Sequence, residues 1–384
     1  MTVSRKVSGD WLSAVATQKV CAALAGAGHQ ALFVGGCVRN ALLGVRVADI
    51  DIATDAHPET VSQLCTAAGL KVIPTGIDHG TVTVVSGGIP HEVTTFRRDV
   101  ETDGRRAVVA FSARIEDDAM RRDLTMNALY ARPDGTLVDP LGGLPDLLAR
   151  RVRFVGNAAD RIREDYLRIL RFFRFHACYG DPAGGIDPEG LAACAELADG
   201  IAAVSRERIG AEMRKLLAAP DPAPAVAAMA AAGVLTRFLP GAATDFLAPL
   251  VHLEAALPAR WQRRLAALGG EDVADRLRLS KADADTLAKT GEALRSGLDP
   301  AALGYRFGAE IATDAVLIRA AALGTELPVG WAAALVFGAA CVLPVRAADL
   351  MPALQGRDLG QRLMELESRW IESGFTLTRA ELLA

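Results

Sequence analysis

Two aspartates inside an apolar segment limit what this chain can fold into. Asp49 and Asp51 stand one residue apart in the segment ADIDIAT, with Ile50 and Ile52 as their neighbours. In a β-strand, residues i and i+2 lie on the same face, so both carboxylates should project together while the isoleucines enter the core. Two adjacent carboxylates repel each other, and we therefore expect a cation between them.

The pattern of apolar residues predicts the fold around this strand. Up to about residue 140, strand-like runs such as ALFVGG, TVTVV and HEVTTF alternate with helix-like segments, one of them at 58–68. Further along, strand signals nearly vanish and apolar residues recur at helical spacing. We therefore expect an α+β fold, with a small mixed-sheet head at 1–145, a helical neck at 146–218, and a helical body and tail at 219–384.

The composition is that of a folded protein without an export signal. With 384 residues, the chain is too long for one ordinary core, and 51% hydrophobic and 23% charged residues suit globular domains. The N-terminal segment carries charges and lacks the apolar core of a signal peptide, so we expect a cytoplasmic location. The uncharged segment 327–345 approaches the length of a membrane span, but prolines near both of its ends shorten the apolar stretch. We therefore expect a buried helix there.

Charge is distributed unevenly along the chain. The formal net charge of −4 argues against a general coat of positive charge for nucleic acid. Residues 150–174 nevertheless contain eight arginines and only three acidic residues. Such a local basic strip on an acidic protein favours one specific anionic partner.

The carboxylates and a glycine pair together predict phosphoryl-transfer chemistry. Glu92, in HEVTTF, is the candidate for a third carboxylate beside Asp49 and Asp51. Mg²⁺ prefers one or two carboxylates plus substrate phosphate oxygens, and two such ions can activate a hydroxyl and stabilise a leaving oxygen. Gly35 and Gly36, at an expected strand-to-helix turn, would let backbone N–H groups approach a triphosphate. We therefore predict Asp49, Asp51 and Glu92 as catalytic residues, with both aspartates holding metal.

Taken singly, each of these features has a simpler interpretation. A GG pair is often only a tight turn, and a DxD is often a solvated strand edge or loop. A DxD after an apolar strand also places the aspartyl nucleophile of haloacid-dehalogenase-type phosphatases. That interpretation requires a longer apolar strand before the first aspartate, and it leaves the upstream glycines and arginine without a role.

The sequence resembles a known superfamily along seven ordered blocks. The first block resembles the signature of the DNA polymerase β-like nucleotidyltransferases, in the branch of class II tRNA CCA-adding enzymes and bacterial poly(A) polymerases. The resemblance extends over about residues 30–217, and one departure is Asn40, where family members usually carry Asp. In chain order the blocks are GGCVRNALLGVRVADIDIAT (35–54), TGIDHGTVTV (75–84), HEVTTFRRD (91–99), RRDLTMNALY (121–130), DPLGG (139–143), REDYLRILRFFRF (163–175) and SRERIGAEMRKLL (205–217).

The resemblance implies a specific activity and its partners. It implies an enzyme that adds or repairs the 3′-terminal CCA of tRNA from CTP and ATP, using Mg²⁺, with two ions, and no nucleic-acid template. The helical C-terminal half would bind the tRNA acceptor stem and elbow. The resemblance also implies nucleotide-binding roles, and Asp139 with its two following glycines resembles a head-to-neck hinge. The residues implied to bind nucleotide are Gly35, Gly36, Arg39, Arg122, Asp123, Asn127, Glu164, Asp165, Arg168 and Arg171.

The block REDYLRILRFFRF predicts how bases are selected. On one helix, Asp165 and Arg168 would be neighbours at i and i+3, with Arg171 a further turn along. A carboxylate only accepts and a guanidinium only donates, while cytosine and adenine each show an amino donor beside a ring-nitrogen acceptor. One Asp–Arg pair can therefore read both bases, and uracil or guanine would cost about 1–3 kcal/mol per mismatched contact. Taken alone, Asp-x-x-Arg is more often an ordinary ion pair on a helix surface.

Three other functions are compatible with these motifs. Bacterial poly(A) polymerases share the fold, but they carry a basic GRRF-like segment where this chain has TGIDHGTVTVVSGG. An enzyme that adds only CC or only A is a second alternative, which the resemblance does not exclude. A non-catalytic RNA-binding protein on the same scaffold is the alternative from another class, and the intact set of three carboxylates argues against it.

Overall fold

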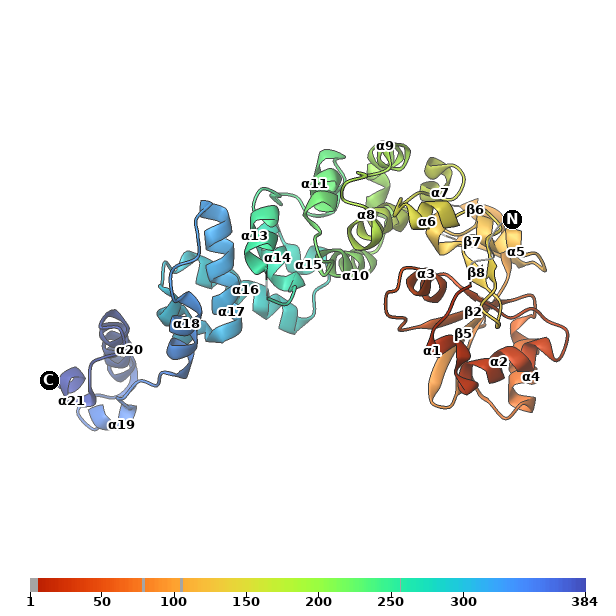
Figure 1. Ribbon diagram of the computed structural model, residues 1–384. Helices are drawn as coiled ribbons and strands as arrows, with labels where there is room; N and C mark the ends of the chain where they lie inside the picture. Colours follow the sequence, from red (N-terminus) through yellow and green to blue (C-terminus); the bar gives the residue numbers. More distant parts are fainter. Residues whose placement is uncertain (1–5, 78–79, 104–105, 256) are drawn as a thin grey trace. The chain divides into compact units, whose positions relative to one another are not determined.

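The computed structural model describes residues 6–77, 80–103, 106–255 and 257–384 of the chain (Figure 1). Asp78 and His79, from the TGIDHGTVTV block, lie outside the described residues. The chain divides into two compact units, unit 1 at 1–238 and unit 2 at 239–384. The head and neck expected at 1–145 and 146–218 both lie in unit 1, and these finer boundaries stay predictions.

A seven-stranded mixed sheet forms the head, as the alternating pattern predicted. Its strand order is β3-β4-β5-β2-β1-β8-β9, and of its neighbouring pairs only β2 with β5 is parallel. A separate two-stranded sheet joins β6 to β7. The strands are β1 (Leu32–Val34), β2 (Ile50–Thr54), β3 (Lys71–Gly76), β4 (Thr81–Ser86), β5 (Ile89–Thr95), β6 (Arg97–Asp103), β7 (Arg106–Phe111), β8 (Tyr130–Ala131) and β9 (Leu137–Val138).

Two helices cover one face of this sheet and leave the other for the acidic side chains. α2 (Val15–Ala25) and α4 (Pro58–Ala67) both pack on β4 and β5. Thr17, on α2, bonds the ring of His91, which lies opposite Ile50 in the β2–β5 register. The covered face therefore carries Ile50, and side chains alternate across a strand, so Asp51 belongs to the opposite face.

Beyond the sheet, unit 1 is helical, and the helix expected over 163–175 is in fact two helices. Asp165 has extended backbone angles, φ −157° and ψ 105°, between α7 and α8. Its Oδ1 accepts a hydrogen bond at 3.1 Å from the N–H of Leu167, the first residue of α8. The other helical elements of unit 1 are α1 (Asp10–Ser13), α3 (Gly36–Leu42), α5 (Ile115–Met120), η2 (Thr125–Asn127), α6 (Leu144–Leu148), α7 (Ala158–Glu164), α8 (Leu167–Tyr179), α9 (Pro188–Glu196), η3 (Ala198–Ala203), α10 (Arg206–Leu217), α11 (Ala223–Ala231) and α12 (Leu235–Phe238).

In its described residues, unit 2 contains helices and no strand. Its longest helix, α17, is kinked at Gly308, whose φ of 76° breaks the helical backbone. The helices are α13 (Leu247–Glu254), α14 (Trp261–Leu268), α15 (Val273–Arg276), α16 (Lys281–Arg295), α17 (Pro300–Leu323), α18 (Trp331–Ala340), α19 (Ala347–Leu350), α20 (Gly356–Glu372) and α21 (Arg379–Leu383).

The expectation of a buried helix in 327–345 is wrong. Within α18, only Leu335 and Gly338 are buried, while Val336 and Phe337 are 62% and 53% exposed. The helix packs closely on α17 through one narrow stripe, since a Cβ on Gly338 would lie 1.8 Å from the Ala301 carbonyl oxygen. Among the described residues, no helix combines the length and the apolar character that crossing a membrane requires.

Unit 2 also buries a cluster of charged side chains that the sequence patterns did not predict. Glu254 accepts from Arg263 through Oε1 at 2.9 Å and from Arg264 through Oε2 at 2.7 Å. Arg263 also donates from Nε to Asp314 at 2.8 Å, and Asp314 is fully buried. We call these four residues the Glu254 cluster. Each carboxylate of the cluster is paired with arginine, because Asp314 Oδ2 also forms an ion pair with Arg260 at 2.9 Å, as buried charges require.

Candidate active site

Two of the three predicted catalytic carboxylates lie directly opposite each other in the sheet. Asp51 on β2 is the register partner of Glu92 on β5, in the parallel pair. Asp49 lies immediately before β2 and is exposed, as Glu92 is, whereas Asp51 is half-buried. Ile50 and Ile52 are buried, so the alternation predicted from ADIDIAT is present in the strand.

The electrostatics of Asp51 fit a cation at this edge. The pKa of Asp51 is raised to about 6, mainly by burial and also by the charges of Glu92 and Asp49, while the charge of Arg122 opposes this rise. Carboxylates in one another's field favour a bound cation, which relieves their repulsion. The described residues contain no group of three His, Cys, Asp or Glu side chains gathered closely enough to hold a metal. The metal-binding roles of Asp49 and Asp51 therefore stay predictions.

The glycine turn lies beside an arginine of the RRDLTMNALY block. Gly35 precedes α3 with φ 68°, a conformation that glycine adopts without strain, and Gly36 is the first residue of α3. A Cβ on Gly35 would lie 3.3 Å from Arg122 Nη1. Arg122 is itself held by Asp118 Oδ2 at 2.9 Å and by the Tyr130 hydroxyl at 3.0 Å. The fold thus brings the turn, Arg122 and the edge of β2 together.

Arg39 is engaged by protein groups. Its guanidinium donates to Asn127 Oδ1 at 2.6 Å, to Asn40 Oδ1 at 2.9 Å and to the Tyr179 hydroxyl at 2.8 Å. The amide of Asn40 also donates to the Arg46 carbonyl at 3.0 Å, so this departure from the family pattern uses both ends of its side chain. A direct contact between Arg39 and phosphate stays a prediction.

Asp123 joins the head to α8. Its Oδ2 accepts from Arg171 Nε at 2.6 Å, and its Oδ1 accepts from Asn127 Nδ2 at 3.0 Å. Burial alone would raise the pKa of Asp123, but Arg171 and these hydrogen bonds hold that pKa below its usual value. Asp123 is therefore a charged, fixed acceptor between two residues that the sequence predicted as nucleotide-binding.

A polar cavity of about 270 Å³ gathers five of the predicted residues. It also includes Arg121 and two residues that were not predicted as site residues. These are Arg97 on β6, from the HEVTTFRRD block, and Asp118 on α5, which belongs to none of the blocks. For Asp118, the one available signal was its i,i+4 spacing from Arg122. The lining residues are Arg97, Asp118, Arg121, Arg122, Asp123, Asp165, Arg168 and Arg171.

Asp165 and Arg168 both line this cavity, but each pairs with another residue. Asp165 Oδ2 accepts from Arg208 Nη2 at 2.7 Å, and Arg208 belongs to α10. Arg168 Nη1 donates to Glu164 Oε2 at 2.6 Å. Glu164 also pairs with Arg161 and is not among the residues that line the cavity. It holds Arg168 in place, and its predicted contact with nucleotide stays untested.

The DPLGG block forms a capped and crowded turn. Asp139 accepts hydrogen bonds from Gly143 N at 2.8 Å and from Leu144 N at 2.9 Å, at the start of α6. A Cβ on Gly143 would lie 2.4 Å from the Thr125 carbonyl oxygen. Gly143 is therefore explained by close packing, and the hinge role implied for this block stays a prediction.

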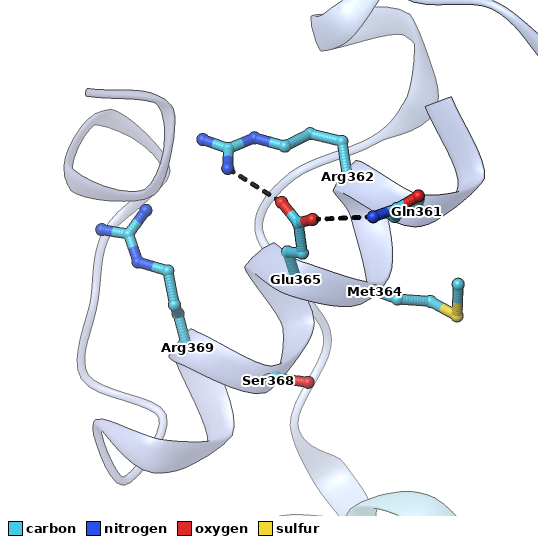
Figure 2. Close-up of a pocket in the computed structure, with 6 residues that line it drawn as sticks. All are labelled: Gln361, Arg362, Met364, Glu365, Ser368 and Arg369. Carbon is cyan, nitrogen blue, oxygen red and sulfur yellow. Dashed lines mark hydrogen bonds and ion pairs between the residues drawn. The ribbon is translucent and has the colours of Figure 1, made fainter. Parts of the chain in front are cut away.

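A second pocket, in unit 2, is lined by a single helix (Figure 2). Its lining residues all come from α20, where Arg362 pairs with Glu365 at 3.1 Å. One helix face cannot surround a ligand, whereas the cavity in unit 1 is built from β6, α5, α8 and the segments next to them. The unit 1 cavity is therefore the candidate site.

Comparison with known proteins shows similarity over the head and part of the helical region. Residues 31–153 match the family model described as Poly A polymerase head domain, and residues 185–246 match the one described as probable RNA and SrmB-binding site of polymerase A. The human CCA tRNA nucleotidyltransferase 1, mitochondrial, is 47% identical over 190 residues, 49% of this chain and 44% of that protein. A CCA-adding enzyme of Geobacillus thermodenitrificans is 42% identical over 218 residues, 56% of this chain and 52% of that protein. The chain thus spans about half the length of these curated relatives.

Solved structures extend the similarity to nearly the whole chain. The crystal structure of the Bacillus stearothermophilus CCA-adding enzyme in complex with CTP has a TM-score of 0.73 at 30% identity, and the match covers 93% of this chain and 92% of that one. The Thermotoga maritima CCA-adding enzyme complexed with tRNA has a TM-score of 0.70 at 18% identity, which supports the fold alone. On the combined identity and coverage of the Bacillus stearothermophilus match, the chain belongs to the CCA-adding enzyme family.

Proposed function

We propose that this chain is a tRNA nucleotidyltransferase that adds or repairs the 3′-terminal CCA of tRNA. Its substrates would be tRNA, CTP and ATP, with release of pyrophosphate and without a nucleic-acid template. The observation that carries this proposal is the 270 Å³ cavity, where the acceptor Asp165 and the donors Arg168 and Arg171 face one space. The relatives named as CCA-adding enzymes support it.

The chemistry would take place at the acidic edge of β2 and β5. Nucleotidyltransferases of this family generally use a divalent metal, and we propose Mg²⁺, with two ions, held by Asp49 and Asp51. When bound, such ions neutralise triphosphate charge and make the terminal hydroxyl of the tRNA a better nucleophile. Glu92, opposite Asp51, would orient that hydroxyl as a hydrogen-bond acceptor. The hydroxyl oxygen would form a bond to the α-phosphorus, the bond from that phosphorus to the pyrophosphate oxygen would break, and the hydroxyl proton would pass to Glu92 or to solvent water.

Base selection would depend on the side chains around the cavity. Asp165 would accept from the amino group of cytosine or adenine, and Arg168 would donate to the neighbouring ring nitrogen. Because Arg208 and Glu164 already hold these two side chains, each is oriented before nucleotide arrives. A carbonyl oxygen from uracil or guanine would face the Asp165 carboxylate, and that mismatch disfavours both bases.

The helical part of the chain would hold the tRNA. We propose that it contacts the acceptor stem and elbow mainly through phosphates and duplex shape. The match of residues 185–246 to a probable RNA-binding site supports this partner. A cytoplasmic location also stays a proposal, since the human relative is named as mitochondrial.

Poly(A) polymerase is the second candidate, because the model that matches the head is named for that enzyme. A primer-extension assay separates the candidates. The purified chain is incubated with CTP and ATP and one of three RNAs: tRNA lacking CCA, tRNA ending in CC, or oligo(A). We expect complete CCA on the first RNA, a single A on the second and no extension of the third. Long A tails would indicate poly(A) polymerase, whereas stopping after CC, or extending only the CC-ended tRNA, would indicate a CC-adding or A-adding enzyme.

A further inference from the structure

Two residues of α8 reach back into the head and are joined there by a continuous set of hydrogen bonds. Arg171 donates from Nε to Asp123 Oδ2 at 2.6 Å, and Asp123 Oδ1 accepts from Asn127 Nδ2 at 3.0 Å. Asn127 Oδ1 accepts from Arg39 at 2.6 Å, and Arg39 donates to the Tyr179 hydroxyl at 2.8 Å. We call these five residues the Tyr179 network. It starts and ends on one helix, because Arg171 and Tyr179 are two turns apart on α8.

The chemistry of each member fixes the direction of every bond. Asn127 accepts from a guanidinium, which can only donate, and donates to a carboxylate, which can only accept. Its amide therefore has one allowed orientation, which Arg39 sets from one side and Asp123 from the other. Along these hydrogen bonds, a change at Tyr179 reaches Asp123 through Arg39 and Asn127.

Arg39 is the member most sensitive to a lost partner. The residue is 6% exposed, and neutral oxygens of Asn40, Asn127 and Tyr179 accept its hydrogen bonds. The Tyr179 ring lies 4.2 Å from the guanidinium carbon, measured to its centroid, and adds a cation–π contact. Burial lowers the pKa of Arg39, which reflects the cost of a charge away from water. Removing the Tyr179 hydroxyl would leave a donor of this buried cation unsatisfied.

We propose that Tyr179 is a positioning residue for nucleotide binding, acting through Arg39 and Asn127 on the wall of the cavity formed by Asp123 and Arg171. This inference rests on the proposed function, because it requires the cavity to take a nucleotide. Tyr179 is not among the residues that line the cavity, so it has no means of distinguishing one base from another. Loss of the Tyr179 hydroxyl therefore weakens the binding of CTP and of ATP equally and leaves the choice of base unchanged.

The direct test is Tyr179→Phe, with Tyr305→Phe as a matched control. Both variants keep the aromatic ring and remove a hydroxyl that makes a 2.8 Å hydrogen bond, to Arg39 in one case and to Glu367 in unit 2 in the other. We expect Tyr179→Phe to raise KM for CTP and for ATP by about fivefold each, with kcat within about twofold of wild type. Tyr305→Phe should leave both constants unchanged. Unchanged KM values in Tyr179→Phe, or a rise for one nucleotide only, would overturn the inference.

A double-mutant cycle tests the route through the network. If Tyr179 acts through Asn127, the combination of Tyr179→Phe with Asn127→Ala should raise KM by clearly less than the product of the two single effects. Combination with Asp165→Asn, outside the network, should give the product of the single effects. A multiplicative result for the Asn127 pair would refute the route.

The inference and the proposed function fail in different ways. CTP binding is measured by calorimetry on the full chain without RNA, beside the primer-extension assay. A chain that binds CTP but extends no tRNA would contradict the proposed function, while a weaker CTP affinity in Tyr179→Phe would still support the positioning role. Normal CCA addition with unchanged CTP affinity in Tyr179→Phe would contradict the positioning role alone.

Discussion

Arginine and carboxylate side chains line a cavity in unit 1 but are buried in the core of unit 2. In unit 1, Asp165 and Arg171 are about one-third exposed, 33% and 32% as side chains, and both line the candidate cavity. In unit 2, the side chains of the Glu254 cluster are between 0% and 6% exposed. Arginine and carboxylate pairs thus occur both at a cavity and within a sealed core.

The difference lies in how completely the partners satisfy one another. Both oxygens of Glu254 accept from arginines, and Asp314 is fully buried and pairs with Arg263 and Arg260, so these carboxylates have little left to offer a ligand. Among the described residues, Asp165 pairs with Arg208 through Oδ2 and accepts from Leu167 N through Oδ1, and its side chain is one-third exposed, so its carboxylate can still accept from a ligand. Buried ion pairs whose oxygens are all bonded stabilise the fold. Partly exposed pairs at a cavity can still bind a ligand.

The strongest test of this comparison removes the acidic edge of the head. Asp51→Ala combined with Asp49→Ala should lower nucleotide addition by about three orders of magnitude or more, because the carboxylates that would hold the ions are gone. The melting temperature should not fall, since the change also relieves repulsion. Primer extension and calorimetric unfolding measure the two quantities. Retained incorporation would indicate that the catalytic carboxylates lie elsewhere.

The converse test breaks the sealed cluster. Glu254→Ala leaves Arg263 and Arg264 buried without their shared carboxylate, and we expect a loss of about 3–5 kcal/mol in the free energy of unfolding. Urea denaturation measures this loss. Glu365→Ala on α20 is the matched control, because it removes a surface partner and should cost less than about 1 kcal/mol. Equal losses of unfolding free energy in the two variants would contradict the distinction between buried and exposed ion pairs.

Asp165→Ala should have the opposite profile, with a functional effect and a small structural one. Without the carboxylate, discrimination against UTP should fall by about tenfold and turnover should decrease. The free energy of unfolding should change by less than about 1 kcal/mol, because the ion pair with Arg208 is partly exposed. Competition between CTP and UTP in primer extension measures discrimination. Unchanged selectivity would exclude Asp165 as the base-reading acceptor.

The smallest expected effect is that of Arg208→Ala. Asp165 would keep its bond to Leu167 N but lose the guanidinium that orients its other oxygen. We expect discrimination against UTP to fall by about threefold, because the ion pair between Arg208 and Asp165 is partly exposed and therefore weak. Lys215→Ala, an exposed change near the end of the same helix, is the control. A larger effect than that of Asp165→Ala would mean that Arg208 itself contacts the nucleotide.

Local patterns were sufficient wherever the structure follows from neighbours along the chain. The alternation in ADIDIAT predicted the buried Ile50 and Ile52, and the runs TVTVV and HEVTTF predicted two further strands of the sheet. The single helix expected from one block was wrong at Asp165, because the extended backbone of this residue ends α7 and α8 begins only at Leu167. The burial expected for 327–345 was wrong because α18 packs through a single stripe on α17.

The sequence by itself determined the mixed-sheet head, the helical remainder and most residues of the candidate site, because strand and helix periodicity and short motifs are local properties. Only the tertiary structure decided which partners those residues take. The pairing of Asp165 with Arg208, of Arg171 with Asp123 and of Arg39 with Tyr179 joins residues 43, 48 and 140 positions apart. Pairings over such distances depend on how helices and sheet pack together, and no spacing along the chain encodes them.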